Sequence, residues 1–184
     1  MTKATYFLTP NASGTAFTGS GYTPDGTLPA GAIACTQTQA DNFSAYALSG
    51  GAIVAAPAAQ LLAQAQAAQI SAITQACAAA ITSGFASSAL GSAHTYPSGL
   101  TDQANLAANV LSSLLPGLPS TWTTPQLCCD PEGVWAYREH TAAQIQQVGA
   151  DWRSFSSSCL LKKKALEDKI KLAKTVGKVQ SLAW

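Results

Sequence analysis

The residues best suited to acid–base chemistry in this chain of 184 residues are its two histidines, His94 and His140. Neither lies in a GxSxG elbow or beside a Cys–His signature that would supply an activated nucleophile. His94 falls in a predicted turn, and His140 directly precedes a predicted helix. We interpret both as structural residues, with a general-base role as the alternative for each.

Three carboxylates, Asp130, Glu132 and Glu139, surround a predicted turn close to His140. Two carboxylates facing each other across a cleft could serve as the acid and the base or nucleophile of a glycosidase. Acids around an exposed turn are more often solvated charges, so we predict no catalytic residue. A glycan-active enzyme is the competing hypothesis, and in that case Asp130→Asn or Glu139→Gln would abolish the activity.

The five cysteines also offer no clear site. Their number is odd and no two have CxxC spacing, so we expect buried thiols rather than disulfides. A zinc site built from Cys128, Cys129 and His140 is the alternative, but it would need a further ligand and an unusual spacing. Gly19-Ser20-Gly21 lacks the downstream residues of a nucleotide-binding loop. We therefore expect no metal and no cofactor.

The pattern of the first 56 residues predicts a small α+β unit. Strand-like segments lie at Ala4–Leu8, Ala32–Cys35 and Ile53–Val54, and glycines and prolines between residues 14 and 29 predict turns. Thr36 predicts the cap of a short helix over residues 37–48, which Gly50 and Gly51 would end.

Residues 57–184 predict a second, mainly helical domain. An Ala- and Gln-rich helix is expected over 58–84, with a coiled-coil-like seam of small side chains, and another over about 101–115. A β-hairpin is expected near 126–138 around the turn Asp130–Gly133, with Trp135 and Tyr137 on one face. Thr141 and Gln144 predict a capping box that starts a helix reaching about Lys174.

The predicted fold class is therefore α+β: a small N-terminal α/β unit, a long connecting helix, then a mainly α-helical domain with one β-hairpin. The two long helices carry apolar stripes that suit packing either within the chain or against other subunits. The residues predicted to form such an interface are Leu62, Ile70, Ile73, Cys77, Ile81, Trp152 and Phe155.

The distribution of charge favours a role in an assembly. The chain is 10% charged, against roughly a quarter in an ordinary domain, and no formal charge occurs from Asn42 to Thr101. Free-standing proteins normally display mixed charges, so this stretch predicts a surface that other protein covers. Replacing Ile73 or Ile81 with Asp would then abolish assembly.

Other partner classes have weaker support. The lysines gathered after residue 150 follow an apolar helix, which indicates a solvated face, with a phosphate-binding face as the alternative. The net charge of +1 is not that of a nucleic-acid-binding domain. Glutamines interrupt the run Ala52–Ala80, so no membrane insertion is expected, and no secretory signal is visible at Met1–Phe7.

Two blocks carry a resemblance to a known family. The first runs from Gly84-Phe85-Ala86-Ser87-Ser88-Ala89-Leu90-Gly91 through His94-Thr95-Tyr96-Pro97 to Thr101-Asp102-Gln103-Ala104-Asn105-Leu106. The second runs from Cys129-Asp130 and Gly133-Val134-Trp135 into His140-Thr141-Ala142-Ala143-Gln144-Ile145-Gln146-Gln147-Val148-Gly149. Over about residues 65–184 the chain resembles an uncharacterised domain of bacteriophage tail-fibre and related tail proteins. Residues 1–56 are similar to the small unit that precedes this domain in tail-fibre and tail-fibre-assembly proteins.

The resemblance implies a non-enzymatic structural component of a phage tail, in the fibre or baseplate, which acts by docking onto other tail subunits. It implies no catalytic residue. We expect a homo-oligomer, with a trimer favoured, made in the host bacterial cytoplasm and carried in the virion. A tail-fibre assembly chaperone absent from the mature particle is the alternative.

Overall fold

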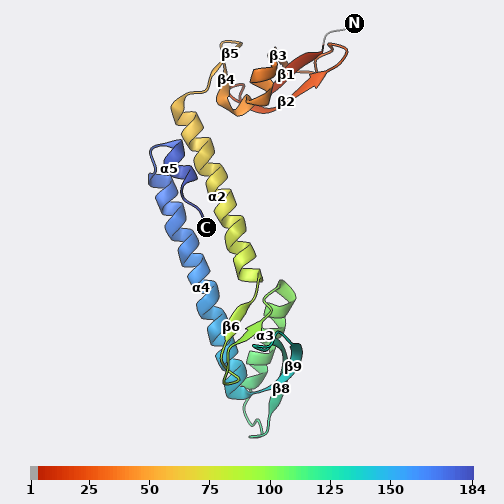
Figure 1. The fold of residues 1–184 in the computed structure, drawn as a ribbon, viewed down its shortest axis with the longest axis vertical. Coiled ribbons are helices and arrows are strands. Elements are labelled where there is room, and N and C mark those ends of the chain that lie inside the picture. Colours follow the sequence, from red (N-terminus) through yellow and green to blue (C-terminus); the bar gives the residue numbers. More distant parts are fainter. Residues whose placement is uncertain (1–3) are drawn as a thin grey trace. The chain divides into compact units, whose positions relative to one another are not determined.

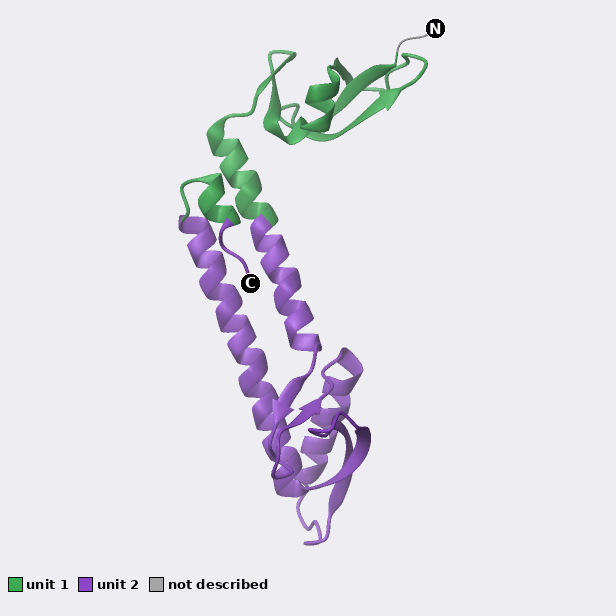
Figure 2. Cartoon of the chain, viewed as in Figure 1, with its two compact units in different colours: residues 1–68, 173–180 green, residues 69–172, 181–184 purple. Residues whose placement is uncertain are grey.

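The computed structural model describes residues 4–184, and these form two compact units (Figure 2). Among the described residues, one unit comprises 4–68 and 173–180, and the other comprises 69–172 and 181–184. The long helix α2 (Ala58–Thr82) runs from the first unit into the second. None of the helices between residues 4 and 184 combines the length and the apolarity that a membrane span needs.

The first unit is built on a three-stranded antiparallel sheet in the order β2-β1-β3. Its strands are β1 (Thr5–Pro10), β2 (Phe17–Thr23) and β3 (Ile33–Cys35). A helix α1 (Gln37–Asp41), a 3₁₀ turn η1 (Phe43–Ala45) and the hairpin β4 (Tyr46–Ser49) and β5 (Ala52–Ala55) follow. The helix α5 (Val176–Gln180) belongs to the same unit. The buried side chains include Leu8, Phe17 and Ala47.

The helix expected over residues 37–48 is wrong beyond Asp41. Thr36 caps its start as expected, since the Thr36 hydroxyl accepts from the Gln39 amide at 3.2 Å. Gly50 and Gly51, however, both have positive φ, and they form the two-residue loop that joins β4 to β5. Two such residues suit a type I′ hairpin turn, so the glycines reverse a strand instead of ending a helix.

The strand β2 lies entirely within residues 14–29, for which only turns were expected. Gly21 is paired with Phe7 across the sheet, and a Cβ added at Gly21 would lie 2.6 Å from the Phe7 ring. The glycine therefore makes room for an aromatic ring on the neighbouring strand. Composition alone does not distinguish this use of glycine from its use in a turn.

The second unit holds a four-stranded antiparallel sheet in the order β6-β7-β8-β9. Figure 1 labels β6, β8 and β9 of this sheet. Its strands are β6 (Phe85–Ser87), β7 (His94–Tyr96), β8 (Thr123–Cys129) and β9 (Trp135–Thr141). The helices α3 (Leu100–Ser113) and α4 (Ala142–Leu172) complete it with part of α2. A core of six buried residues joins the sheet to both helices: Phe85, Tyr96, Leu106, Cys128, Ile145 and Val148.

The expectation of a mainly helical domain with one β-hairpin is therefore wrong. The hairpin β8–β9 exists, but it is half of a four-stranded sheet, and residues 4–184 form a mixed α+β fold with three sheets. The missed strands β6 and β7 have three residues each, too few to show alternation. Glycines, serines and a proline flank both strands, and these residues concealed the pairing of Phe85 with Tyr96.

Candidate interaction surface

The buried polar pair Tyr96 and His140 joins strands β7 and β9 inside the second unit. The Tyr96 hydroxyl lies 2.8 Å from His140 Nε2, and His140 Nδ1 lies 2.8 Å from the Arg138 carbonyl oxygen. Because a carbonyl can only accept, Nδ1 carries the proton and Nε2 accepts from the tyrosine. Burial lowers the pKa of His140 and raises the pKa of Tyr96, so the neutral form of each is favoured.

This pair is closed to substrates, because Tyr96 and His140 are 1% and 0% exposed. The other histidine, His94, is also buried, and its Nδ1 donates to the Ser92 carbonyl oxygen at 3.0 Å. Both histidines therefore stabilise the sheet. His140 lies in β9, one residue before the capping residue Thr141, rather than in the helix itself.

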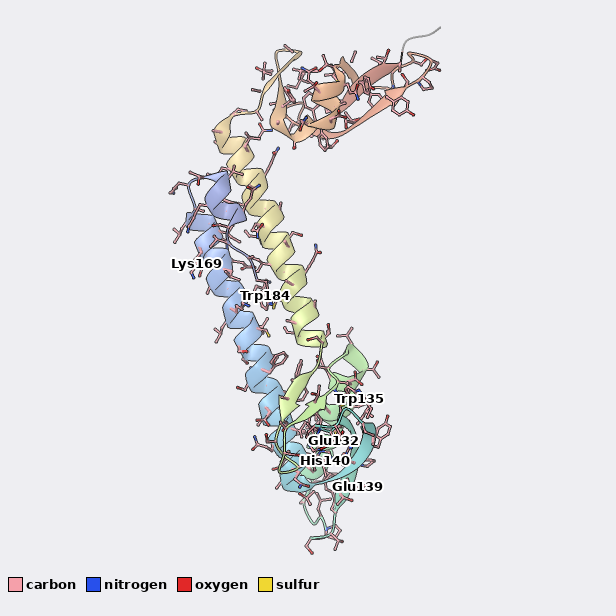
Figure 3. All side chains as sticks on the ribbon, viewed as in Figure 1. Glu132, Trp135, Glu139, His140, Lys169 and Trp184 are labelled. Carbon is pink, nitrogen blue, oxygen red and sulfur yellow. The ribbon has the colours of Figure 1, made fainter. Side chains whose placement is uncertain are left out.

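The three carboxylates do not converge on a cleft. Asp130 accepts from the Val134 amide at 2.8 Å and from Arg138 Nη2 at 2.5 Å, so it closes the hairpin turn. Glu132 lies in that turn and Glu139 lies on β9, both exposed (Figure 3). With Asp130 engaged in this way, the geometry offers no pair of acids facing a bound sugar.

A joint metal site at Cys128 and Cys129 is disfavoured by their adjacency in β8, because successive strand residues point to opposite faces. Cys128 is buried in the core and Cys129 is half-buried on the other face. Over residues 4–184 no group of three or more His, Cys, Asp or Glu side chains is placed to hold a metal ion. All five cysteines are free thiols.

Several residues predicted for an interface lie in intrachain packing. Ile73 and Cys77 of α2 are 1% and 3% exposed, and the Cys77 thiol lies 3.7 Å from the Cys159 carbonyl oxygen of α4. Trp152 and Phe155 of α4 pack on Phe85, with ring centroids 5.4 and 6.4 Å away. Leu62, Ile70 and Ile81 are half-buried. A contact of this helix pair with another subunit stays a prediction.

The lysines of α4 and the last residue of the chain interact with one another and with nearby acids. Lys163 and Lys164 pair with Glu167 and Asp168 at 3.4 and 2.5 Å. Lys162 Nζ lies 4.4 Å from the ring centroid of Trp184, within range of a cation–π contact. These pairs suit a solvated helix face better than a row of cations for phosphate.

An open apolar surface of the second unit lies between α3 and α4, where sequence reasoning placed no site. A groove of about 390 Å³ is lined mainly by apolar side chains, including Leu106, Val110 and Trp152. Leu111, which also lines it, is 67% exposed, and Leu114 and Leu115 at the end of α3 are 62% and 60% exposed. We call the groove and these three leucines the α3 apolar surface.

The spacing of the leucines in α3 could be seen in the sequence. The sequence did not show which of these leucines face the core and which face outward. Leu106 and Val110 face the core, whereas Leu111, Leu114 and Leu115 face outward. An amphipathic pattern predicts one apolar stripe, and here the stripe is wider than the core can cover. An exposed apolar patch of this kind is a candidate site for interaction with a protein, a membrane or a ligand.

A second open surface is the outer face of the hairpin β8–β9. Trp135 and Tyr137 project from it and are 51% and 73% exposed, which confirms that they share one face of β9. Leu127 of β8 lies opposite Tyr137 on the same face. Figure 3 labels Trp135 and Glu139 on this strand.

Comparison with known proteins identifies a family for most of this unit. Residues 64–181 match a family described as a domain of unknown function (DUF4376). The chain belongs to this family. No curated protein matches the chain, and no solved structure matches it. The DUF4376 match covers the sheet, α3 and α4, so the α3 apolar surface and the open hairpin face both lie within the family domain.

Proposed function

We propose that this DUF4376 protein is a non-catalytic docking subunit of a bacteriophage tail, associated with the tail fibre or the baseplate. The observation that carries the docking role is the α3 apolar surface, on which Leu111, Leu114 and Leu115 are each at least 60% exposed. Exposed leucines next to an apolar groove are costly for an isolated protein and useful at an interface.

A docking role also agrees with the state of the groups that could do chemistry. His140 and Tyr96 are closed off inside the unit, and Asp130 is engaged by the turn and by Arg138. The placement in a phage tail rests on the sequence resemblance. The proposed partners are other tail subunits and further copies of this chain, with a trimer favoured, in a virion assembled in the host bacterial cytoplasm.

The alternative is a tail-fibre assembly chaperone that leaves before the particle is complete. A chaperone would use the same apolar surface, because a transient client also needs an apolar docking site. The two proposals differ in whether the protein stays in the finished particle. Neither requires a cofactor or a metal.

The test is quantitative mass spectrometry of purified phage particles and of the lysate of infected cells. A fixed copy number per particle, in multiples of three or six, is the expected result. Abundance in the lysate together with absence from particles would overturn the structural role and favour the chaperone. Absence of any association with phage proteins in either fraction would overturn both.

A matched pair of variants connects that measurement to the α3 apolar surface. Leu111→Asp changes an exposed residue of this surface, and Leu172→Asp changes a residue of α4 that is 73% exposed. Both chains should fold, because neither side chain is buried. We expect Leu111→Asp to reduce incorporation at least about tenfold, a loss of about 1.4 kcal/mol of docking free energy, and Leu172→Asp to leave it unchanged. Equal incorporation of both variants would remove this surface from the docking site.

A further inference from the structure

The outer edge of strand β9 has backbone groups that no other strand uses. Pro125 of β8 lies opposite Glu139 of β9. Because proline has no backbone N–H, Pro125 cannot donate a hydrogen bond to Glu139. The Pro125 carbonyl oxygen accepts from Asn109 Nδ2 at 3.3 Å, on the side of β8 away from β9. Pro125 and Glu139 therefore form a non-hydrogen-bonded pair, and the Glu139 backbone N–H and C=O point away from β8.

Hydrogen-bonded and non-hydrogen-bonded pairs alternate along an antiparallel strand. The backbone N–H and C=O of Trp135 and Tyr137, at two-residue steps from Glu139, therefore also point away from β8. Thr141, the following residue of this set, already uses its N–H, which donates to Gln144 Oε1 at 2.9 Å. Over residues 4–184, no group of the protein bonds the backbone N–H or C=O of Trp135, Tyr137 or Glu139. The edge thus presents three donors and three acceptors in a row.

This edge has few of the features that usually prevent strand pairing. Native proteins protect an edge with a bulge, a proline, charged side chains (lysine above all), a very short strand or a covering helix or loop. Of these features β9 carries two charged residues: Arg138, which is paired with Asp130, and Glu139. β9 is seven residues long, pairs with β8 without a register shift, and contains no proline and no lysine. Its side chains on the open face include the exposed rings of Trp135 and Tyr137.

We propose that β9 pairs with β9 of a second copy of this chain, antiparallel, about a two-fold axis at Tyr137. The three free residues are symmetric about Tyr137, so this register pairs Tyr137 with Tyr137 and Trp135 with Glu139 of the other copy. Each of the three pairs exchanges two hydrogen bonds, about six in all. The pairing joins two four-stranded sheets into one continuous sheet.

The side chains are compatible with this register on both faces. On the open face, the two Tyr137 rings lie side by side, and each Trp135 ring lies diagonal to a tyrosine, within the reach of aromatic side chains. On the other face, the small Ala136 lies opposite Arg138. No two like charges stand opposite each other, which removes the usual penalty against self-pairing. A second copy is therefore the occupant that matches this edge in both backbone and side chains.

The available area sets the strength of the pair. With Trp135 and Tyr137 51% and 73% exposed, each ring offers about 100–150 Å², and the four rings together about 500 Å². Backbone pairing adds to this, but the total stays near or below the roughly 1,000 Å² of a lasting interface. The pair is therefore weak, with a dissociation constant of about 10–100 µM, and it becomes populated where local concentration is high.

The test is sedimentation velocity of the full chain from about 1 to 300 µM, with a charge exchange at the two-fold axis. Tyr137→Lys and Tyr137→Glu each place like charges opposite each other, so each variant alone should lose the concentration-dependent doubling of mass that the native chain shows. An equimolar mixture should regain association, because lysine then faces glutamate. Leu161→Lys is the matched control: Leu161 is 71% exposed on α4, and its replacement should change nothing.

Amide hydrogen exchange locates the contact. Protection of the Trp135, Tyr137 and Glu139 amides should rise with concentration in the native chain. A native chain that stays monomeric to 300 µM, or an association that both single-charge variants retain, would overturn the proposal. Association lost equally in Leu161→Lys would place the contact elsewhere and also overturn it.

This inference concerns the chain alone and does not depend on a phage tail. Failure of the self-pairing would leave the particle measurement unaffected, and absence from particles would leave the self-pairing unaffected. The copy number per particle nevertheless bears on the self-pairing. A copy number in odd multiples of three would exclude complete two-fold pairing within the particle, whereas six would allow both symmetries.

Discussion

At the scale of single residues, the core of the second unit depends on a polar pair that is fully satisfied. Tyr96 donates to His140 Nε2, and His140 donates from Nδ1 to the Arg138 carbonyl oxygen. A buried imidazole with both nitrogens bonded costs little while it is neutral. Once protonated, Nε2 would become a second donor facing the tyrosine oxygen, in a place that water does not reach.

The stability of the chain should therefore fall in mild acid. Burial holds the pKa of His140 below its ordinary 6.5 in the folded protein. Below pH 6.5 His140 binds a proton in the unfolded chain but resists protonation in the folded chain. The contribution of neutral His140 to the free energy of unfolding is therefore fully present above pH 6.5 and decreases as the pH falls below it. Urea unfolding between pH 8 and pH 5 measures this.

The control is His140→Gln, which removes the titrating group while keeping a polar side chain. We expect it to be less stable at pH 8 and to lose less stability on acidification than the native chain does. If the stability of the native chain and that of this variant changed in parallel with pH, His140 would not be the group responsible for the loss of stability in acid. The pH 5–8 range isolates histidines, because ordinary carboxylates titrate below it.

At the scale of elements, helices α3 and α4 approach each other closely at Gly149, where α4 has no side chain. A Cβ added at Gly149 would lie 2.8 Å from Val110 Cγ2 on α3. Valine is stiff at its first side-chain torsion and cannot swing aside. Gly149 thus sets the spacing of the two helices, and it lies at the apolar groove between them.

Gly149→Ala should destabilise the chain by about 1–3 kcal/mol, although alanine favours a helix by about 1 kcal/mol over glycine. The cost comes from forcing α3 and α4 apart. Gly177→Ala in α5 is the matched control, because nothing lies within 4 Å of the added Cβ. It should be neutral or slightly stabilising in thermal unfolding.

The double variant Gly149→Ala with Val110→Ala separates overpacking from other causes. If the clash is with Val110, shortening that side chain should make the added methyl tolerated, so the two changes would be strongly non-additive. Additive costs would mean that Gly149 acts through the helix backbone and not through its contact with α3.

At the scale of the whole molecule, each of the two compact units has buried apolar side chains of its own. Leu8 and Phe17 belong to the first unit, whereas Ile145 and Val148 belong to the second. Two compact units predict two cooperative units, each able to open while the other stays closed.

Leu8→Ala should accordingly cost about 2–5 kcal/mol and increase amide exchange in β1 and β2. The slowly exchanging amides of Ile145 and Val148 should keep their protection. Ile145→Ala is the reciprocal variant, with loss of protection confined to the second unit. Exchange that increased in both units with either variant would show one cooperative unit in place of two.

Features that depend on near neighbours could be predicted from the sequence alone. The helix cap at Thr36, the capping box at Thr141, the hairpin around Asp130 and the shared face of Trp135 and Tyr137 follow from residues a few positions apart. Local hydrogen bonds and strand alternation suffice for these, so a single chain segment carries the information.

The remaining features depend on contacts between segments that are distant in the chain. Three-residue strands such as β6 have no period to detect, and they exist because Phe85 finds Tyr96 and the core across the chain. The apolar stripe of α3 could be predicted from the sequence. Which of its leucines face α4 and which are exposed to solvent depends on how closely the helices pack at Gly149. The free edge of β9 likewise follows from its place at the end of the sheet order, because pairing between distant segments decides which strand is left unpaired.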